Sequence, residues 1–219
     1  MSTTDVELVE QGGKVQDAAP AVVSRWRNPG LWLTILGVLA IGLWPIITQN
    51  AATREVFLFI LLNVVLASSL NIILGYTGYV SFGHVVFYGL GGYVGLYLMS
   101  RHGAPLWLAM IAGGLAAAVL AFLLGKAILR LRGAYFALAT IGVNEAMRAF
   151  VNNFEPFGSA TGLSLNFQVY NNYGGALQAL WMTYYILLAL ALLAVMLSYV
   201  VKTSKFGLGL MAIREDEDA

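Results

Sequence analysis

ALWMTYYILLALALLAVMLSYVV, residues 179–201, is a run of 23 residues without a charged side chain. An α-helix rises about 1.5 Å per residue and the hydrocarbon core of a bilayer is about 30 Å thick, so the run is long enough to cross a membrane. Lys202 and Lys205 follow it, as is typical of a membrane helix that ends at the polar interface. The run predicts a transmembrane helix.

Five upstream stretches are also predominantly apolar. They are residues 31–48, 56–74, 85–99, 106–124 and 134–151. The last of them alone contains charged side chains, Glu145 and Arg148. The chain is 59% hydrophobic and 11% charged, against about 25% charged in ordinary globular domains. A secretory signal is an alternative for the first stretch, but it is long for one and further spans follow. The sequence therefore predicts an all-α, polytopic membrane protein with about six transmembrane helices.

The polar parts of the chain suggest how it is organised around these spans. We expect residues 1–28 to form a disordered cytoplasmic tail, residues 29–201 the transmembrane domain, and residues 202–219 a cytoplasmic segment. With six spans both termini lie on one side, and nine of the twelve Lys and Arg residues fall on that side. These nine are Lys14, Arg25, Arg27, Lys126, Arg130, Arg132, Lys202, Lys205 and Arg214, against Arg54, Arg101 and Arg148. Because cations near span ends are retained in the cytoplasm, we predict that both termini are cytoplasmic.

Composition also excludes several kinds of chemistry. The formal net charge of +1 and the scattered cations do not suit nucleic acid. The chain has no cysteine, and its two histidines, His84 and His102, stand alone. We therefore expect no thiolate nucleophile, no metal site and no nucleic-acid partner, and the lipid bilayer as the surrounding medium.

The block GYTGYVSFGH, residues 75–84, separates two apolar stretches. Its glycines permit a helix to end and another to begin, and Gly-rich interruptions of membrane helices often line cavities. We therefore consider Gly75, Gly78, Ser81 and Gly83 as residues beside a translocation path. A plain connecting loop is the alternative, and the phosphate-binding Walker pattern is absent.

Glu145 and Arg148 lie three residues apart on one helical face, with Asn144 close to both. A charge in the middle of a span costs about 2.5–3.5 kcal/mol, so an ion pair between the two would lower that cost. Asn144 and Glu145 are candidates for a translocation path. A helix end that already lies in the polar interface is the alternative.

The final segment, SKFGLGLMAIREDEDA, residues 204–219, predicts a short amphipathic helix. Phe206, Leu210 and Ile213 share one stripe of it. Such a helix in a cytoplasmic segment can dock into a groove of a soluble partner. The alternative, a helix on the membrane surface, is disfavoured by the four acidic residues at positions 215–218.

Three segments together resemble one family. SKFG with MAIREDE in the final segment, LRLRGAYFALATIG at 129–142 and LGYTGYVSFGHVVFYGLGGY at 74–93 are similar to signatures of the permease subunits of branched-chain amino-acid ATP-binding-cassette importers. The resemblance covers about residues 71–219 and keeps the family's order. The chain departs from the family in two respects. Where the family usually has a basic residue after the Phe-Gly pair, this chain has Leu208 and Gly209. The family also continues with further membrane helices after this segment, so the 219 residues are expected to be a truncated form.

The resemblance implies a permease domain at residues 29–201 in a multi-pass protein of a prokaryotic inner membrane. It implies three kinds of partner: a paralogous permease, two ATP-binding subunits that hold the ATP, and an extracytoplasmic substrate-binding protein. It assigns the final segment to coupling with the ATPases. The residues so implied are Ser204, Lys205, Phe206, Gly207, Ala212, Ile213, Arg214, Glu215, Asp216 and Glu217.

Other functions stay open from the sequence. The same architecture could carry urea, amides or another small solute, because the external binding protein does most of the selecting in such systems. A proton-coupled carrier needs buried acids, and Glu145 alone qualifies. An intramembrane enzyme could use Glu145, Asn144 and His84, but no nucleophile or metal constellation supports it. We expect no cofactor and no catalytic residue in this chain.

Overall fold

The computed structural model describes residues 29–131 and 133–215, and over these residues it contains helices and connecting turns only. The predicted tail at 1–28, Arg132 and residues 216–219 lie outside the described residues. The six long helices are α2 (Pro29–Thr48), α3 (Ala51–Thr77), α4 (His84–His102), α5 (Leu106–Ile128), α6 (Ala134–Asn153) and α8 (Ala176–Thr203). The shorter elements are η1 (Glu155–Phe157), η2 (Ser159–Thr161), α7 (Phe167–Asn171) and α9 (Lys205–Glu215).

Each of the six predicted spans is a helix, so the prediction of a polytopic all-α protein is confirmed. Four of the helices described, α2, α3, α5 and α8, are both long and apolar enough to cross a membrane. The glycine-rich α4 and the polar α6 are as long but less apolar. The connection between α6 and α8 contains the short elements η1, η2 and α7.

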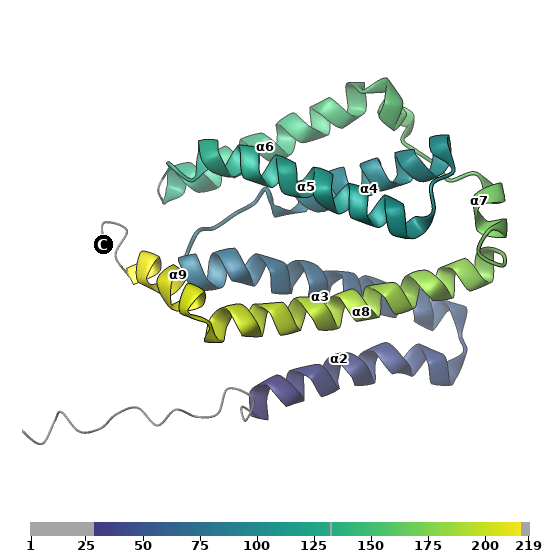
Figure 1. Cartoon of the computed structure of the whole chain (residues 1–219), viewed down its shortest axis with the longest axis horizontal. Helices are drawn as coiled ribbons and strands as arrows, with labels where there is room; N and C mark the ends of the chain where they lie inside the picture. The colour runs from purple at the N-terminus through teal and green to yellow at the C-terminus, as the bar shows by residue number, and fades with distance from the viewer. Residues whose placement is uncertain (1–28, 132, 216–219) are drawn as a thin grey trace, which may run out of the picture.

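The long helices form two layers (Figure 1). α2, α3 and α8 pack together in one layer, and α4, α5 and α6 pack together in the other. The chain runs back and forth, so that the connections at 78–83 and 129–133 lie at the same end as α9. The connections at 49–50, 103–105 and 154–175 lie at the opposite end.

The first layer holds the apolar core of the described chain. Leu61, Tyr184 and Ala191 are fully buried, and Val38 and Leu188 join them. The Tyr184 hydroxyl donates a 2.7 Å hydrogen bond to the carbonyl of Gly42, which ties α2 to α8. Near the other end of α8, the Tyr76 hydroxyl donates to the Ser198 carbonyl at 2.8 Å. Polar groups of α3 and α8 therefore meet each other instead of lipid.

In the second layer, α4 and α5 approach until their backbones touch. A Cβ atom built at Gly91 would lie 3.2 Å from the Gly113 carbonyl oxygen, and one at Gly95 would lie 3.3 Å from that of Ala109. Small residues spaced by four are typical of membrane helix pairs, because they permit close van der Waals packing where no hydrophobic driving force exists. Gly91 and Gly95 thus form the interface of α4 with α5.

The described cations divide between the two ends of the molecule. Lys126, Arg130, Lys202, Lys205 and Arg214 belong to helix ends near α9, whereas Arg54, Arg101 and Arg148 belong to the opposite ends of α3, α4 and α6. The cytoplasmic location of the α9 end stays a prediction.

Cysteine labelling tests this orientation, and the chain has no native thiol to remove. Asn166 and Lys205 are both exposed and lie at opposite ends. In intact cells we expect Asn166→Cys to react with a membrane-impermeant maleimide and Lys205→Cys to react only after permeabilisation. The reverse pattern would invert the topology.

Candidate coupling site

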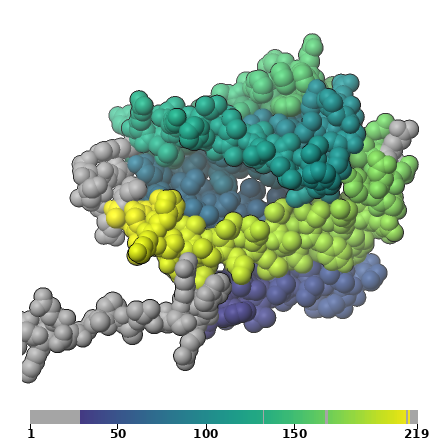
Figure 2. Space-filling view, in the orientation of Figure 1, coloured from purple at the N-terminus to yellow at the C-terminus, as the bar shows by residue number. Residues whose placement is uncertain are grey.

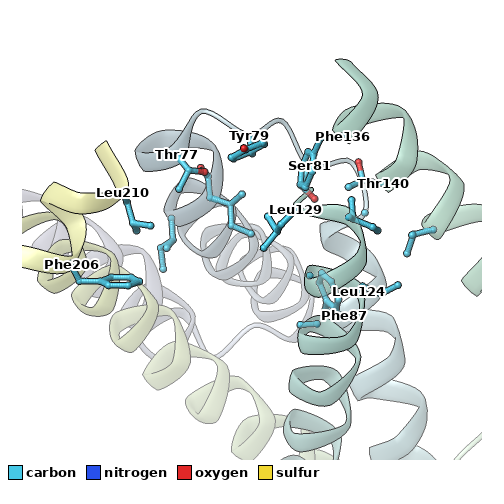
Figure 3. A pocket seen from close by; sticks show the side chains of 17 residues that line it. Thr77, Tyr79, Ser81, Phe87, Leu124, Leu129, Phe136, Thr140, Phe206 and Leu210 are labelled. Atoms are coloured by element: carbon cyan, nitrogen blue, oxygen red, sulfur yellow. The ribbon is translucent and has the colours of Figure 1, made fainter. Parts of the chain in front are cut away.

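Three sequence segments converge at the α9 end, around one cavity of about 530 Å³ (Figure 3). They are the segment after α3, the junction between α5 and α6, and α9. Figure 2 shows the molecule hollowed between the layers, with α8 and α9 along one side. These are the segments whose residues resemble family signatures, although they lie up to about 140 positions apart in the sequence.

The segment 78–83 folds back into the bundle instead of leaving it. Gly78, with φ of 77°, ends α3, and its N–H donates to the Leu74 carbonyl at 3.2 Å. The Phe82 N–H then donates to Thr140 Oγ1, at 3.1 Å, about two turns inside α6. His84 Nε2 lies 2.8 Å from Ser69 Oγ, about two turns before the end of α3. Non-helical backbone at this depth is tolerated where it is buried in protein or lines a cavity, which favours the cavity interpretation over a plain loop.

The cavity wall is mostly apolar, with hydroxyl groups from Thr77, Tyr79, Ser81 and Thr140. Two of these hydroxyls are engaged by the backbone. Thr77 Oγ1 donates to the Ile73 carbonyl at 2.6 Å, and Thr140 Oγ1 donates to that of Ala137 at 2.8 Å. The Tyr79 ring packs at 4.9 Å from the ring of Phe136. The wall therefore joins the segment after α3 to the start of α6 through specific contacts.

A tight turn leads from α8 into α9. Ser204 Oγ accepts a 3.1 Å hydrogen bond from the Gly207 N–H, as an N-cap residue does. Gly207 is buried, and a Cβ atom there would collide with the Val201 carbonyl. Ser204 and Gly207, two predicted coupling residues, thus shape the junction.

The inner side of α9 contacts the end of α3 and the cavity. Arg214 Nη1 donates to the Gly75 carbonyl at 3.2 Å, where a cation is favoured beside helix carbonyls. Phe206 and Leu210, two members of the predicted docking stripe, line the cavity. α9 is therefore attached to the Gly-rich block.

The outer side of α9 is exposed. Lys205, Leu208, Gly209 and Ala212 are exposed, and their spacings of three and four place them on one helical face. The side chains of Ile213 and Glu215, like Asp216 and Glu217, lie outside the described residues. Phe206 lines the cavity but is also 68% exposed and lies three residues before Gly209, so it borders the face available to a partner.

The predicted path residues separate into three places. Ser81 and Gly83 line the cavity, whereas Gly75 and Gly78 lie beside Arg214. Asn144 lines a second groove between α4 and α6. Arg148 Nη1 and Glu145 Oε2 are 3.9 Å apart, and their side chains are 74% and 64% exposed, respectively, so the predicted ion pair is present but loose.

Sequence reasoning missed Tyr79, Thr140 and Phe136 as cavity residues. All three lie inside two of the three segments that resemble family signatures, 74–93 and 129–142, and this resemblance was the available signal. Neither hydrophobic periodicity nor composition could identify them as cavity residues, because their place in the cavity wall depends on the path that residues 78–83 take through the bundle.

These features define a polytopic all-α membrane protein whose short helix α9 packs on α3 and α8 at one end of the bundle. Residues 52–219 match the family described as branched-chain amino acid transport system / permease component, and the chain belongs to that family.

Curated relatives include two permease proteins named LivM, of the high-affinity branched-chain amino acid transport system. That of Escherichia coli K12 is 34% identical over 146 residues, which are 66% of this chain and 34% of the relative. The protein of Salmonella typhimurium LT2 is 32% identical over 146 residues, which are again 66% of this chain and 34% of the relative. The aligned part thus spans about a third of the length of these relatives. No solved structure shows a significant match to the chain.

Proposed function

We propose that this chain is a membrane-spanning permease subunit of an ATP-binding-cassette importer that carries branched-chain amino acids across a bacterial inner membrane. The observation that supports it best is the convergence of three signature segments around α9 and one cavity. The names of the relatives supply the substrate class. The names of the relatives give no support to urea or amide transport. Proton coupling would need a buried acid, whereas the side chain of Glu145, the acid considered for it, is 64% exposed.

The partners in this proposal are a paralogous permease, two ATP-binding subunits and an extracytoplasmic substrate-binding protein. The ATP belongs to the partner ATPases. The outer face of α9, formed by Lys205, Leu208, Gly209 and Ala212, docks on an ATPase subunit. Gly209 and Ala212 are small, which permits close approach of a partner surface.

The inner contacts of α9 give the docked helix a mechanical role. Arg214 holds the Gly75 carbonyl at the end of α3, and the turn at Ser204 fixes α9 to α8. Segment 78–83 continues from α3 to Thr140 in α6. A displacement of α9 by a closing ATPase pair therefore acts on both layers of the bundle, and this is how nucleotide-driven closure reaches the cavity.

Gly209→Leu tests this docking face in the transporter assembled with its partners. A Cβ atom at Gly209 meets nothing within 4 Å, so the chain's own fold accepts the side chain while the docking surface is obstructed. We expect ATP hydrolysis stimulated by liganded binding protein to fall by roughly tenfold, the effect of about 1.4 kcal/mol of lost interface energy.

Gly114→Leu is the matched control, because Gly114 on α5 also faces open space. It should leave stimulated hydrolysis unchanged. Full stimulation in Gly209→Leu would show that this face of α9 does not dock on an ATPase.

A further inference from the structure

A second groove, of about 240 Å³, runs between α4 and α6. One wall is formed by α4, whose Val85, Gly89 and Tyr93 are spaced four residues apart. The other wall is formed by α6, whose Asn144, Arg148 and Asn152 have the same spacing. Residues four apart lie on one side of a helix, so two facing rows form the walls.

The two walls differ in chemistry. The α4 wall and the floor are apolar, with Val86 and Val151 buried to 4% and 7% exposure. The α6 wall carries two amides and a guanidinium. The groove is therefore polar along one side and aliphatic along the other.

The charges beside the groove are incompletely satisfied within the described chain. Arg148 reaches Glu145 only at 3.9 Å, beyond hydrogen-bond distance, and both side chains are largely exposed. A guanidinium can bind a carboxylate through two parallel hydrogen bonds. Ionised side chains in a membrane helix normally face a partner or a water-filled cavity and mark solute pathways.

We propose that this groove binds the transported amino acid as a zwitterion. The α-carboxylate pairs with Arg148 and the Asn144 amide, and the branched aliphatic side chain packs on Val86 and its neighbours. Glu145 is not part of the groove lining, but its carboxylate lies 3.9 Å from the Arg148 guanidinium and marks the side of the groove toward which the α-ammonium points. A zwitterion adds no net charge to this pair. The groove volume lies just below the range of about 300–1,000 Å³ typical of drug-sized ligands, which suits a molecule as small as an amino acid.

The location agrees with this role. Asn152 lies near the end of α6 that is opposite α9, the side on which a binding protein would deliver the substrate in the proposed orientation. The 530 Å³ cavity lies at the other end of α6. The inference rests on the proposed transport function and adds a substrate site to it.

Two glycines of α4 provide a matched test. A Cβ atom at Gly89 or at Gly92 meets nothing within 4 Å, but only Gly89 lines the groove. In proteoliposomes that contain the assembled transporter, its binding protein and ATP, we expect Gly89→Leu to lower uptake of labelled leucine by about tenfold or more, whereas Gly92→Leu transports normally. Arg148→Gln should lower uptake by a similar factor, because hydrogen bonds to charged groups are among the stronger ones, while Arg101→Gln should not.

A labelling measurement decides the matter even if Gly89→Leu fails to assemble. Gly89→Cys is the only thiol of its chain, and leucine should slow its reaction with a maleimide, while labelling of Gly92→Cys stays unaffected. Equal uptake by Gly89→Leu and Gly92→Leu, or no protection of Gly89→Cys by leucine in an active transporter, would show that the groove does not bind the substrate. The proposed transport function would remain valid. No uptake of any branched-chain amino acid by the unaltered transporter would overturn the proposed function and this site with it.

Discussion

Gly113→Val should lower the melting temperature of the purified chain in detergent by roughly 6–12 °C. Gly113 is buried, and a Cβ atom there would collide with the carbonyl of Gly91 on α4. Overpacking costs about 1–3 kcal/mol, and the upper value applies because the obstacle is backbone and cannot rotate away. For a domain of this size each kcal/mol shifts the melting temperature by about 2–4 °C.

The neighbouring residue provides the control for this prediction. Gly114 is exposed, and its Cβ position has no neighbour within 4 Å. Gly114→Val introduces the same β-branched side chain into the same helix, and scanning fluorimetry should give a melting temperature close to that of the unaltered chain. Equal losses in the two variants would show that helix propensity, and not the contact of α4 with α5, sets the effect.

Hydropathy was sufficient to find the helices but not to pair them. A helix is present at every predicted span, and the observed helices extend a few residues further, in one case because of a side-chain cap. α3, for example, begins at Ala51, where Asn50 accepts a hydrogen bond from Ala52 at 3.0 Å. A helix that is apolar on all sides has no preferred face in its sequence. The two-layer arrangement therefore depends on close contacts such as Gly42 with Leu188, which composition does not reveal.

The candidate site was only partly predictable for a related reason. The final helix is confirmed as Lys205–Glu215, because its periodicity is local. The orientation of this helix depends on contacts with distant parts of the chain. Phe206 and Leu210 line the cavity, whereas Leu208 and Gly209 face outward. Those two outward residues are the ones that depart from the family's usual basic residue. The departure therefore lies on the face proposed to dock, where the partner surface must complement an apolar side chain.

Gly207→Ala should reduce ATP hydrolysis stimulated by the liganded binding protein by more than about tenfold in the assembled transporter. A single methyl at this buried position collides with the Val201 carbonyl in the last turn of α8, so α9 has to leave its place. It then loses the cap from Ser204 and the bond from Arg214 to Gly75. Since α9 is linked to α3 through that bond, movement of an ATPase no longer reaches the cavity.

Gly209→Ala adds the same methyl to the same helix in open space, and one methyl there should leave stimulation nearly intact. Limited trypsin digestion in detergent provides a readout that does not depend on transport. Lys205 is the first residue of α9, and a displaced α9 exposes the peptide bond that follows it, so Gly207→Ala should be cleaved there faster than Gly209→Ala. Equal cleavage and equal stimulation in the two variants would mean that the tight turn after α8 does not hold α9 against the bundle, and coupling would then have to pass through another part of the chain.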